Sequence, residues 1–133
     1  MPKQQKLWPV LTMAVALVFG LLGTFFVLAP GPASAVFGIS TAAEAELAYV
    51  RALGIRDIAL CLFLLVLLPI SSKAIRRVLA ASALIPAGDI ALVLTASELS
   101  SASPLLLHAS SGVVLLALSA LGPRGEAESR SAP

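Results

Sequence analysis

The stretch RALGIRDIALCLFLLVLLPI, from Arg51 to Ile70, decides the fold. Its second half is uninterrupted hydrocarbon, the composition of a helix that crosses a membrane. Its first half nevertheless carries Arg51, Arg56 and Asp57. Ionisable side chains inside a span are expensive and normally face the bundle interior, a water cavity or a partner. The stretch therefore predicts a membrane helix whose charged end is directed into a shared interior.

The rest of the chain is equally apolar. Of its 133 residues, 59% are hydrophobic and only 12% are charged, and the mean hydropathy is +1.00. The apolar residues form four blocks that approach the length needed to cross a bilayer. The predicted spans are residues 10–28, 48–70, 78–95 and 105–121. We therefore expect an all-α integral membrane four-helix bundle over residues 1–121 and a disordered polar tail over residues 122–133.

Charge predicts the orientation of this bundle and its partners. Basic residues flank the spans on one side only, and the loops on the other side hold acids, Glu44 and Glu46 in one and Glu98 in the other. The positive-inside rule then places both termini in the cytoplasm. Because this explains the net charge of +2, we expect the lipid bilayer as a partner and no nucleic acid. The basic residues are Lys3, Lys6, Lys73, Arg76, Arg77, Arg124 and Arg130.

The N-terminus resembles a secretory signal peptide in outline. It has two lysines, an apolar run and the small residues Ala33-Ser34-Ala35. The apolar run exceeds the usual length of about 7–15 residues, and three more predicted spans follow it. We therefore expect an uncleaved first span.

Prolines and small polar residues predict where the helices end. Ala29-Pro30-Gly31-Pro32 ends the first helix, and residues 33–47 form a re-entrant or interfacial element or a plain loop. Ser40 or Thr41 with Glu44 resembles a capping box, so the second helix begins before it enters lipid.

The third and fourth spans have signals of their own. Pro86 frees the carbonyl of Ser82 and predicts a kink close to Asp89. Ser103-Pro104 is typical of a helix cap followed by a first turn.

The ionisable groups of the spans fall at one level of the predicted bundle. Counting about 1.5 Å per residue inward from the acidic side places them roughly 5–13 Å below that side. On a helical wheel Arg51 and Asp57 face the same interior, whereas Arg56 points elsewhere, to snorkel or to pair with Glu46 or a neighbouring helix. The candidate site residues are Asp57, Asp89, Arg51, Arg56 and His108.

Two interpretations of this group remain open. Buried Arg–Asp pairs can be structural locks that fix helix register. A lock needs no histidine, however, and His108 is the only one in the chain. A carboxyl group in an apolar pocket favours its neutral form and can act as an acid, while one held by arginine stays ionised and can act as a base. The sequence shows no nucleotide-binding glycine loop and no metal-ligand spacing, so we expect no cofactor and no metal.

The run Arg51-Ala-Leu-Gly54-Ile-Arg56-Asp57, with Phe37-Gly38-Ile39 before it and Asp89 and His108 after it, supports a family resemblance. The chain resembles the small four-span fungal membrane proteins grouped as domain of unknown function family 4267, and is more distantly similar to DoxX-like proteins. The resemblance implies a compact four-helix bundle and an association with fungal secondary metabolism. It implies no agreed active site.

The expected function is acid/base catalysis on a lipophilic small molecule. Asp57 and Asp89 would be the acid/base pair, Arg51 or Arg56 their electrostatic partner, and His108 a proton shuttle or hydrogen-bond donor to the substrate. Such a set suits epoxide hydrolysis or cyclisation, and equally double-bond isomerisation.

The alternative is a non-catalytic membrane protein that binds a lipid or metabolite, or assists assembly of a biosynthetic complex. Homo-oligomers or partner enzymes are compatible with either function. Transport is less favoured, because the polar groups form no continuous path across the membrane. The fungal resemblance implies the endoplasmic reticulum as the simplest location.

Overall fold

The computed structural model describes residues 3–96 and 102–123, which fold into helices joined by short connections. The helices are α1 (Lys3–Leu28), α2 (Pro30–Phe37), α3 (Glu44–Leu67), α4 (Ser72–Ser82), α5 (Leu84–Ala96) and α6 (Ser103–Leu121). The predicted all-α class is confirmed. The predicted tail lies, from residue 124 onward, outside the described residues.

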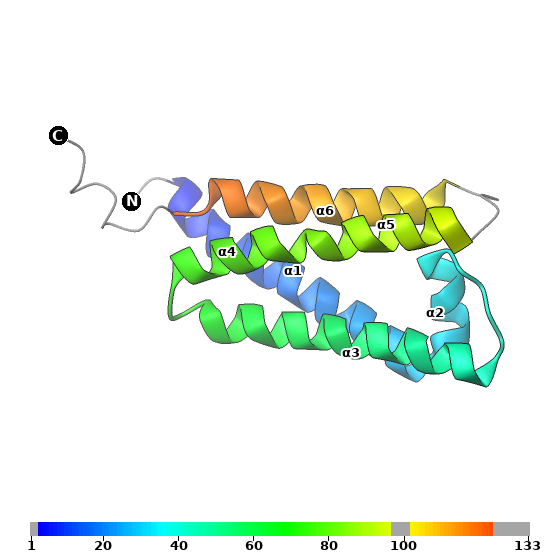
Figure 1. The fold of residues 1–133 in the computed structure, drawn as a ribbon. Coiled ribbons are helices and arrows are strands. Elements are labelled where there is room, and N and C mark those ends of the chain that lie inside the picture. The colour runs from blue at the N-terminus through cyan, green and yellow to red at the C-terminus, as the bar shows by residue number, and fades with distance from the viewer. Residues whose placement is uncertain (1–2, 97–101, 124–133) are drawn as a thin grey trace.

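The long helices run along one another (Figure 1). Helices α4 and α5 continue in one direction, with α6 beside them, and the short α2 crosses one end of the molecule (Figure 1). Helix α1 runs obliquely: it packs most extensively against α3 and much less against α6. This oblique course separates α1 from α6 toward the end where α2 lies.

Within the described residues, three helical stretches are long and apolar enough to cross a membrane. They are Leu7–Leu28, Ser72–Thr95 and Ser103–Leu121. Their apolar side chains mostly face outward, as expected of helices in contact with lipid; Leu21 is 73% exposed and Leu84 is 76% exposed. This is the surface of a multi-pass membrane protein. Helix α3 is as long, at 24 residues, but the charges of its first half distinguish it from the other three.

The segment between the first two long helices is a short helix rather than a plain loop. Pro30 lies in the first turn of α2, where a missing N–H costs nothing. Gly38 ends α2 in the left-handed conformation, with φ of 106°, which favours glycine. A Cβ at Gly38 would also lie 2.7 Å from the ring of Pro104, so the end of α2 lies tightly against the start of α6.

The caps of α3 and α6 differ in detail from the prediction. Helix α3 begins at Glu44, before the apolar run, as expected, but its N-cap is Ala43 and no side chain caps it. Thr41 instead accepts a hydrogen bond from the amide of Ala43 and donates one to Glu46. Helix α6 begins at Ser103 itself, so the predicted cap was wrong by one residue.

The sequence predicted a kink near Ser82 in the third span, and the helix is broken at that place. The helix is interrupted at Ala83, between α4 and α5. Pro86 has no N–H to bond the carbonyl of Ser82, so the helix loses one backbone bond there. Asp89 follows within one turn and is buried, with 5% of its surface exposed. The interruption therefore lies beside the candidate site.

Helices α1 and α3 meet at two glycines. A Cβ added at Gly23 would lie 2.5 Å from the carbonyl oxygen of Gly54, and one added at Gly54 would lie 2.5 Å from the carbonyl oxygen of Gly23. Small residues let the backbones of membrane helices approach closely. This contact lies one turn before Asp57 on α3 and fixes that part of the helix against α1.

Gly54→Ala should lower the free energy of unfolding by about 1–3 kcal/mol or more, because the new methyl group would have to displace backbone. Thermal unfolding in detergent measures the loss. Gly88→Ala is the matched control, since nothing lies within 4 Å of its added Cβ and alanine favours a helix. Equal stability of the two variants would show that the α1–α3 crossing is not close.

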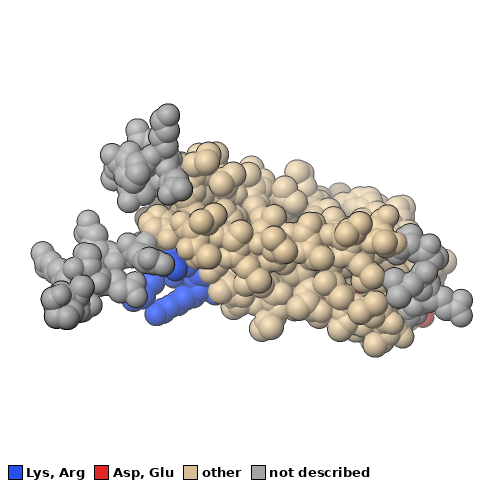
Figure 2. Space-filling view, turned by 90° about the horizontal axis from the view of Figure 1, so that it is seen from above, with Lys and Arg blue, Asp and Glu red and all other residues tan. Residues whose placement is uncertain are grey.

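At the end of the molecule away from α2, side chains of α1 and α4 donate hydrogen bonds to the last turn of α6. Trp8 Nε1 donates to the carbonyl of Leu118 over 2.9 Å, and Arg76 Nε donates to that of Ser119 over 2.8 Å. Lysine and arginine side chains gather at this end (Figure 2). The described acids Glu44 and Glu46 lie at the start of α3, at the other end (Figure 1).

Candidate functional site

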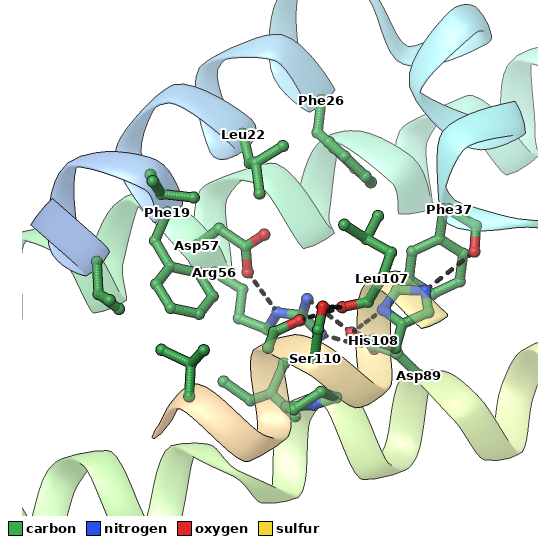
Figure 3. Close-up of a pocket in the computed structure, with 16 residues that line it drawn as sticks. Phe19, Leu22, Phe26, Phe37, Arg56, Asp57, Asp89, Leu107, His108 and Ser110 are labelled. Carbon is green, nitrogen blue, oxygen red and sulfur yellow. Dashed lines mark hydrogen bonds and ion pairs between the residues drawn. The ribbon is translucent and has the colours of Figure 1, made fainter. Parts of the chain in front are cut away.

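The structure brings four of the five candidate residues together. Arg56 and Asp57 come from α3, Asp89 from α5 and His108 from α6. We refer to these four residues as the polar cluster. Asp57, Asp89 and His108 are 5–7% exposed, and Arg56 is half-buried. Figure 3 shows their side chains converging between the helices.

Arg56 is the centre of the polar cluster. Its Nε donates to Oδ1 of Asp57 over 3.0 Å. Its Nη1 and Nη2 donate to Oδ1 and Oδ2 of Asp89 over 3.1 and 3.3 Å. The second pair is the bidentate fork geometry that favours arginine over lysine. Arg56 thereby links α3 to α5.

The prediction that Arg51 faces this interior was wrong. Arg56 pairs with a neighbouring helix, which was one of the alternatives predicted for it, but it does so inside the shared interior and not away from it. The Arg51 side chain is 43% exposed and lies 3.9 Å from Glu44. A helical wheel gives the direction of Cβ, but an arginine side chain is long enough to carry its guanidinium to another face. Arg56 uses this length to reach Asp89, whereas Arg51 lies near the exposed end of α3.

His108 is held by the end of α2. Its Nε2 lies 3.0 Å from the carbonyl oxygen of Phe37, and the two rings pack edge to face with centroids 4.9 Å apart. A carbonyl can only accept, so Nε2 carries a hydrogen and donates it. Nδ1 of the same ring faces Oδ2 of Asp89 at 3.7 Å. In its neutral form His108 therefore presents an unprotonated nitrogen toward Asp89 and can receive a proton there.

The polar cluster forms part of the wall of a cavity of about 330 Å³. Most of the wall is apolar, and its largest contributions come from α1 and α6. Phe19, Leu22 and Phe26 point from α1 toward the charged groups (Figure 3). A mostly apolar cavity with a few converging polar groups is the usual form of a small-molecule site.

The two aspartates differ in how their oxygens are used. Both oxygens of Asp89 accept from Arg56, and Oδ2 also faces His108. Asp57 accepts from Arg56 through Oδ1, and no hydrogen bond to its Oδ2 comes from residues 3–96 or 102–123. No fully buried side-chain nitrogen or oxygen in this part of the chain is unpaired, so Oδ2 of Asp57 is accessible from the cavity. Asp57 is therefore the carboxyl group available to a bound molecule.

The cluster also carries unbalanced charge. With both aspartates ionised, one guanidinium faces two carboxylates, which leaves one net negative charge unless a proton or a ligand compensates it. Burying an unpaired charge is costly, so a bound molecule that compensates this charge would be favoured. Within the described residues no group of three or more potential ligands could hold a metal ion.

Sequence reasoning missed the contribution of Phe37 and of the α1 wall. The carbonyl of Phe37 points to His108 because Gly38 turns the chain sharply after α2: the amides of Gly38 and Ile39 both bond the carbonyl of Ser34 over 3.1 Å. A glycine directly after a short helix is the sequence signal for such a turn. The α1 wall gives no comparable signal, because apolar side chains that face lipid and those that line a cavity have the same composition.

A family model described as a domain of unknown function, DUF4267, matches residues 16–122. The chain belongs to the DUF4267 family. The match includes α2 to α6 and the second half of α1, and thus all four residues of the polar cluster. No curated protein and no solved structure matches this DUF4267 chain.

His108→Phe should loosen α2 while keeping an aromatic ring against Phe37. The buried carbonyl of Phe37 would lose its partner, at a cost of about 1–3 kcal/mol. Hydrogen exchange of the α2 amides, followed by mass spectrometry, should become faster. Ser110→Ala on the same helix is the control, since its hydroxyl bonds only the carbonyl of Leu107. Unchanged α2 exchange in His108→Phe would contradict the anchoring of α2 by His108.

Proposed function

We propose that the protein is a small integral-membrane acid/base enzyme that acts on a lipophilic small molecule, most simply by opening an epoxide through hydrolysis or cyclisation. Isomerisation of a double bond would use the same groups. The observation that carries the proposal is the accessible oxygen of Asp57 in the wall of an apolar cavity, beside a second carboxylate held by Arg56.

The contacts support different roles for the two aspartates. Asp57, with a single hydrogen bond from Arg56 and apolar neighbours, is suited to hold a proton and give it to an epoxide oxygen. Asp89, with two bonds from Arg56, is suited to remain ionised. Nδ1 of His108 can accept the proton of the attacking water or hydroxyl, and Asp89 would stabilise the imidazolium that forms.

In such a cycle the C–O bond of the epoxide breaks as the new C–O bond forms. The proton of Asp57 goes to the oxygen that is released, and the proton of the nucleophile goes to His108. Its return to Asp57 restores the site, so hydrolysis consumes only epoxide and water. Cyclisation would use a hydroxyl group of the substrate in place of water.

We further propose that α1, α3, α4–α5 and α6 form a four-helix bundle that crosses the membrane, with both termini cytoplasmic. The basic end of the molecule would face the cytoplasm, and the polar cluster would lie in the opposite half. The resemblance to proteins associated with fungal secondary metabolism supports a lipophilic metabolite as the substrate and the endoplasmic reticulum as the location.

The test is turnover of a panel of lipophilic epoxides and polyenes by membranes that contain the intact protein, followed by mass spectrometry. Membranes with the Asp57→Asn variant at matched folded abundance are the control. A product formed by the intact protein and absent with Asp57→Asn would support the proposal. Absence of any product across the panel would favour a non-catalytic binding role, for which the mutual pairing of Arg56 with both aspartates is the supporting observation.

A further inference from the structure

The cavity is elongated along the helices. On α1 its lining residues run from Val15 to Phe26, which corresponds to roughly 16 Å along the axis. The charged groups lie toward the end of the cavity that is close to α2. Val15, early in α1, Ile85, one turn before Asp89, and Val114, almost two turns after His108, line the other end. A molecule in the cavity would therefore have a polar end near α2 and an apolar end toward the middle of the bundle.

The cavity opens between α1 and α6. Four of the residues that line the cavity are exposed at the surface, and all four belong to these two helices. They are Val18, Leu107, Ser110 and Val114. The lining residues from α2, α3 and α5 are buried or half-buried. The opening is thus on the side of the molecule and not at its end.

The packing of α1 explains this opening. Near its start α1 is tied to α6 by the bond from Trp8 to Leu118. Near its other end it packs against α3 at Gly23 and Gly54, so it has moved away from α6. The gap left between them has the polar cluster behind it, and the exposed residues at its rim are apolar except for Ser110. Both α1 and α6 contain stretches apolar enough to span a membrane, so this rim would face lipid.

We infer that the opening between α1 and α6 is a lateral portal through which the site takes a compact, neutral, oxygen-bearing lipophile directly from the bilayer. This inference rests on the proposed membrane orientation and deepens the proposed function by naming the route and the ligand class. The volume of about 330 Å³ is at the small end of the range for small-molecule sites, about 300–1,000 Å³, and excludes a two-chain phospholipid.

The chemistry of the polar end defines the ligand further. A neutral Asp57 would balance the charge of the cluster and would have a proton to donate, so the matching group is an oxygen acceptor such as an ether, an epoxide or a ketone. An ammonium ligand would instead pair with an ionised Asp57. The two ligand types can therefore be distinguished by experiment.

The portal is tested by thiol labelling in phosphatidylcholine vesicles, without any need for turnover. Val15→Cys in a Cys61→Ala background places one thiol at the inner end of the cavity. A maleimide with a decyl chain should label it on the order of tenfold faster than a maleimide with a sulfonate group, each relative to its rate with the unfolded protein. If Cys61→Ala fails to fold, Cys61 is retained and its own labelling is subtracted.

A matched pair of variants locates the route. Val114→Trp, at the rim, should slow labelling by the decyl maleimide severalfold. Val113→Trp should not, because Val113 is exposed on the same helix but does not line the cavity. Equal labelling by the two reagents, or equal effects of the two tryptophans, would overturn the lateral portal.

The ligand class is tested by protection of the same thiol. Methyl octyl ketone should slow labelling more than decane or decylamine of the same chain length. Stronger protection by decylamine would overturn the neutral oxygen acceptor, and protection by all three alike would show a purely apolar site. A portal demonstrated in this way would stand even if no epoxide in the turnover panel reacts, so failure of the portal and failure of the proposed chemistry are distinguishable.

Discussion

Arg56→Gln should lower the free energy of unfolding by about 3–5 kcal/mol, a loss matched among the substitutions proposed for this chain only by that of Asp89→Asn. The Arg56 guanidinium donates one hydrogen bond to Asp57 and two to Asp89. Both aspartates are buried. Removing it leaves two carboxylates facing each other without a cation. Thermal or denaturant unfolding in detergent measures the loss.

Arg51→Gln is the matched control for this prediction. It removes the same charge from the same helix, but the Arg51 side chain is 43% exposed and its nearest acid, 3.9 Å away, is the exposed Glu44. Exposed pairs of this kind contribute about 0–1 kcal/mol. A loss in Arg51→Gln as large as that in Arg56→Gln would mean that the assignment of the two arginines is wrong.

The two arginines also show how far the sequence determines the site. The sequence predicted which side chains share one level, because depth depends only on the rise per residue and on where each helix begins. It did not predict which arginine reaches the aspartates. That choice depends on the path of a flexible side chain past Asp57 to a residue 33 positions away, and no periodicity records it.

The positions of the helices could be predicted from the sequence, but the way in which they pack could not. The long apolar helices and the interruption before Pro86 follow from composition and from the missing N–H of proline. The oblique path of α1, which creates the cavity, depends on the contact of Gly23 with Gly54. Glycines in membrane helices are common, so their presence alone does not identify which pair meets.

Asp57→Asn should reduce turnover of any substrate found by about 10²–10⁴-fold, the usual contribution of a positioned acid or base. Asparagine keeps the shape of the side chain and can still accept from Nε of Arg56, but it cannot give a proton to a substrate oxygen. Arg51→Gln again serves as the control and should stay within about twofold, since Arg51 does not line the cavity. Full turnover by Asp57→Asn would remove Asp57 from the chemistry.

A structural lock would produce a different pattern. In a lock both aspartates serve only to hold the helices through Arg56, so each substitution would reduce stability and no substrate would be turned over. In a catalytic site the side chain that reacts keeps some of its polar atoms free of structural hydrogen bonds. Replacing it with a neutral residue of the same shape therefore often leaves the stability of the fold unchanged or improves it. The two patterns differ at Asp57, which accepts one hydrogen bond from Arg56 where Asp89 accepts two, so the stability of the Asp57→Asn variant distinguishes them.

The most direct test of this account compares the thermal unfolding of Asp57→Asn and Asp89→Asn in the same detergent. We expect a clear loss for Asp89→Asn, of about 3–5 kcal/mol, because Arg56 loses its bidentate partner. We expect a change within about 1 kcal/mol for Asp57→Asn, because asparagine is neutral, like the protonated carboxyl group that we propose, and its amide oxygen can still accept from Arg56. Equal and large losses in both variants would contradict separate roles for the two aspartates and would identify the polar cluster as a lock.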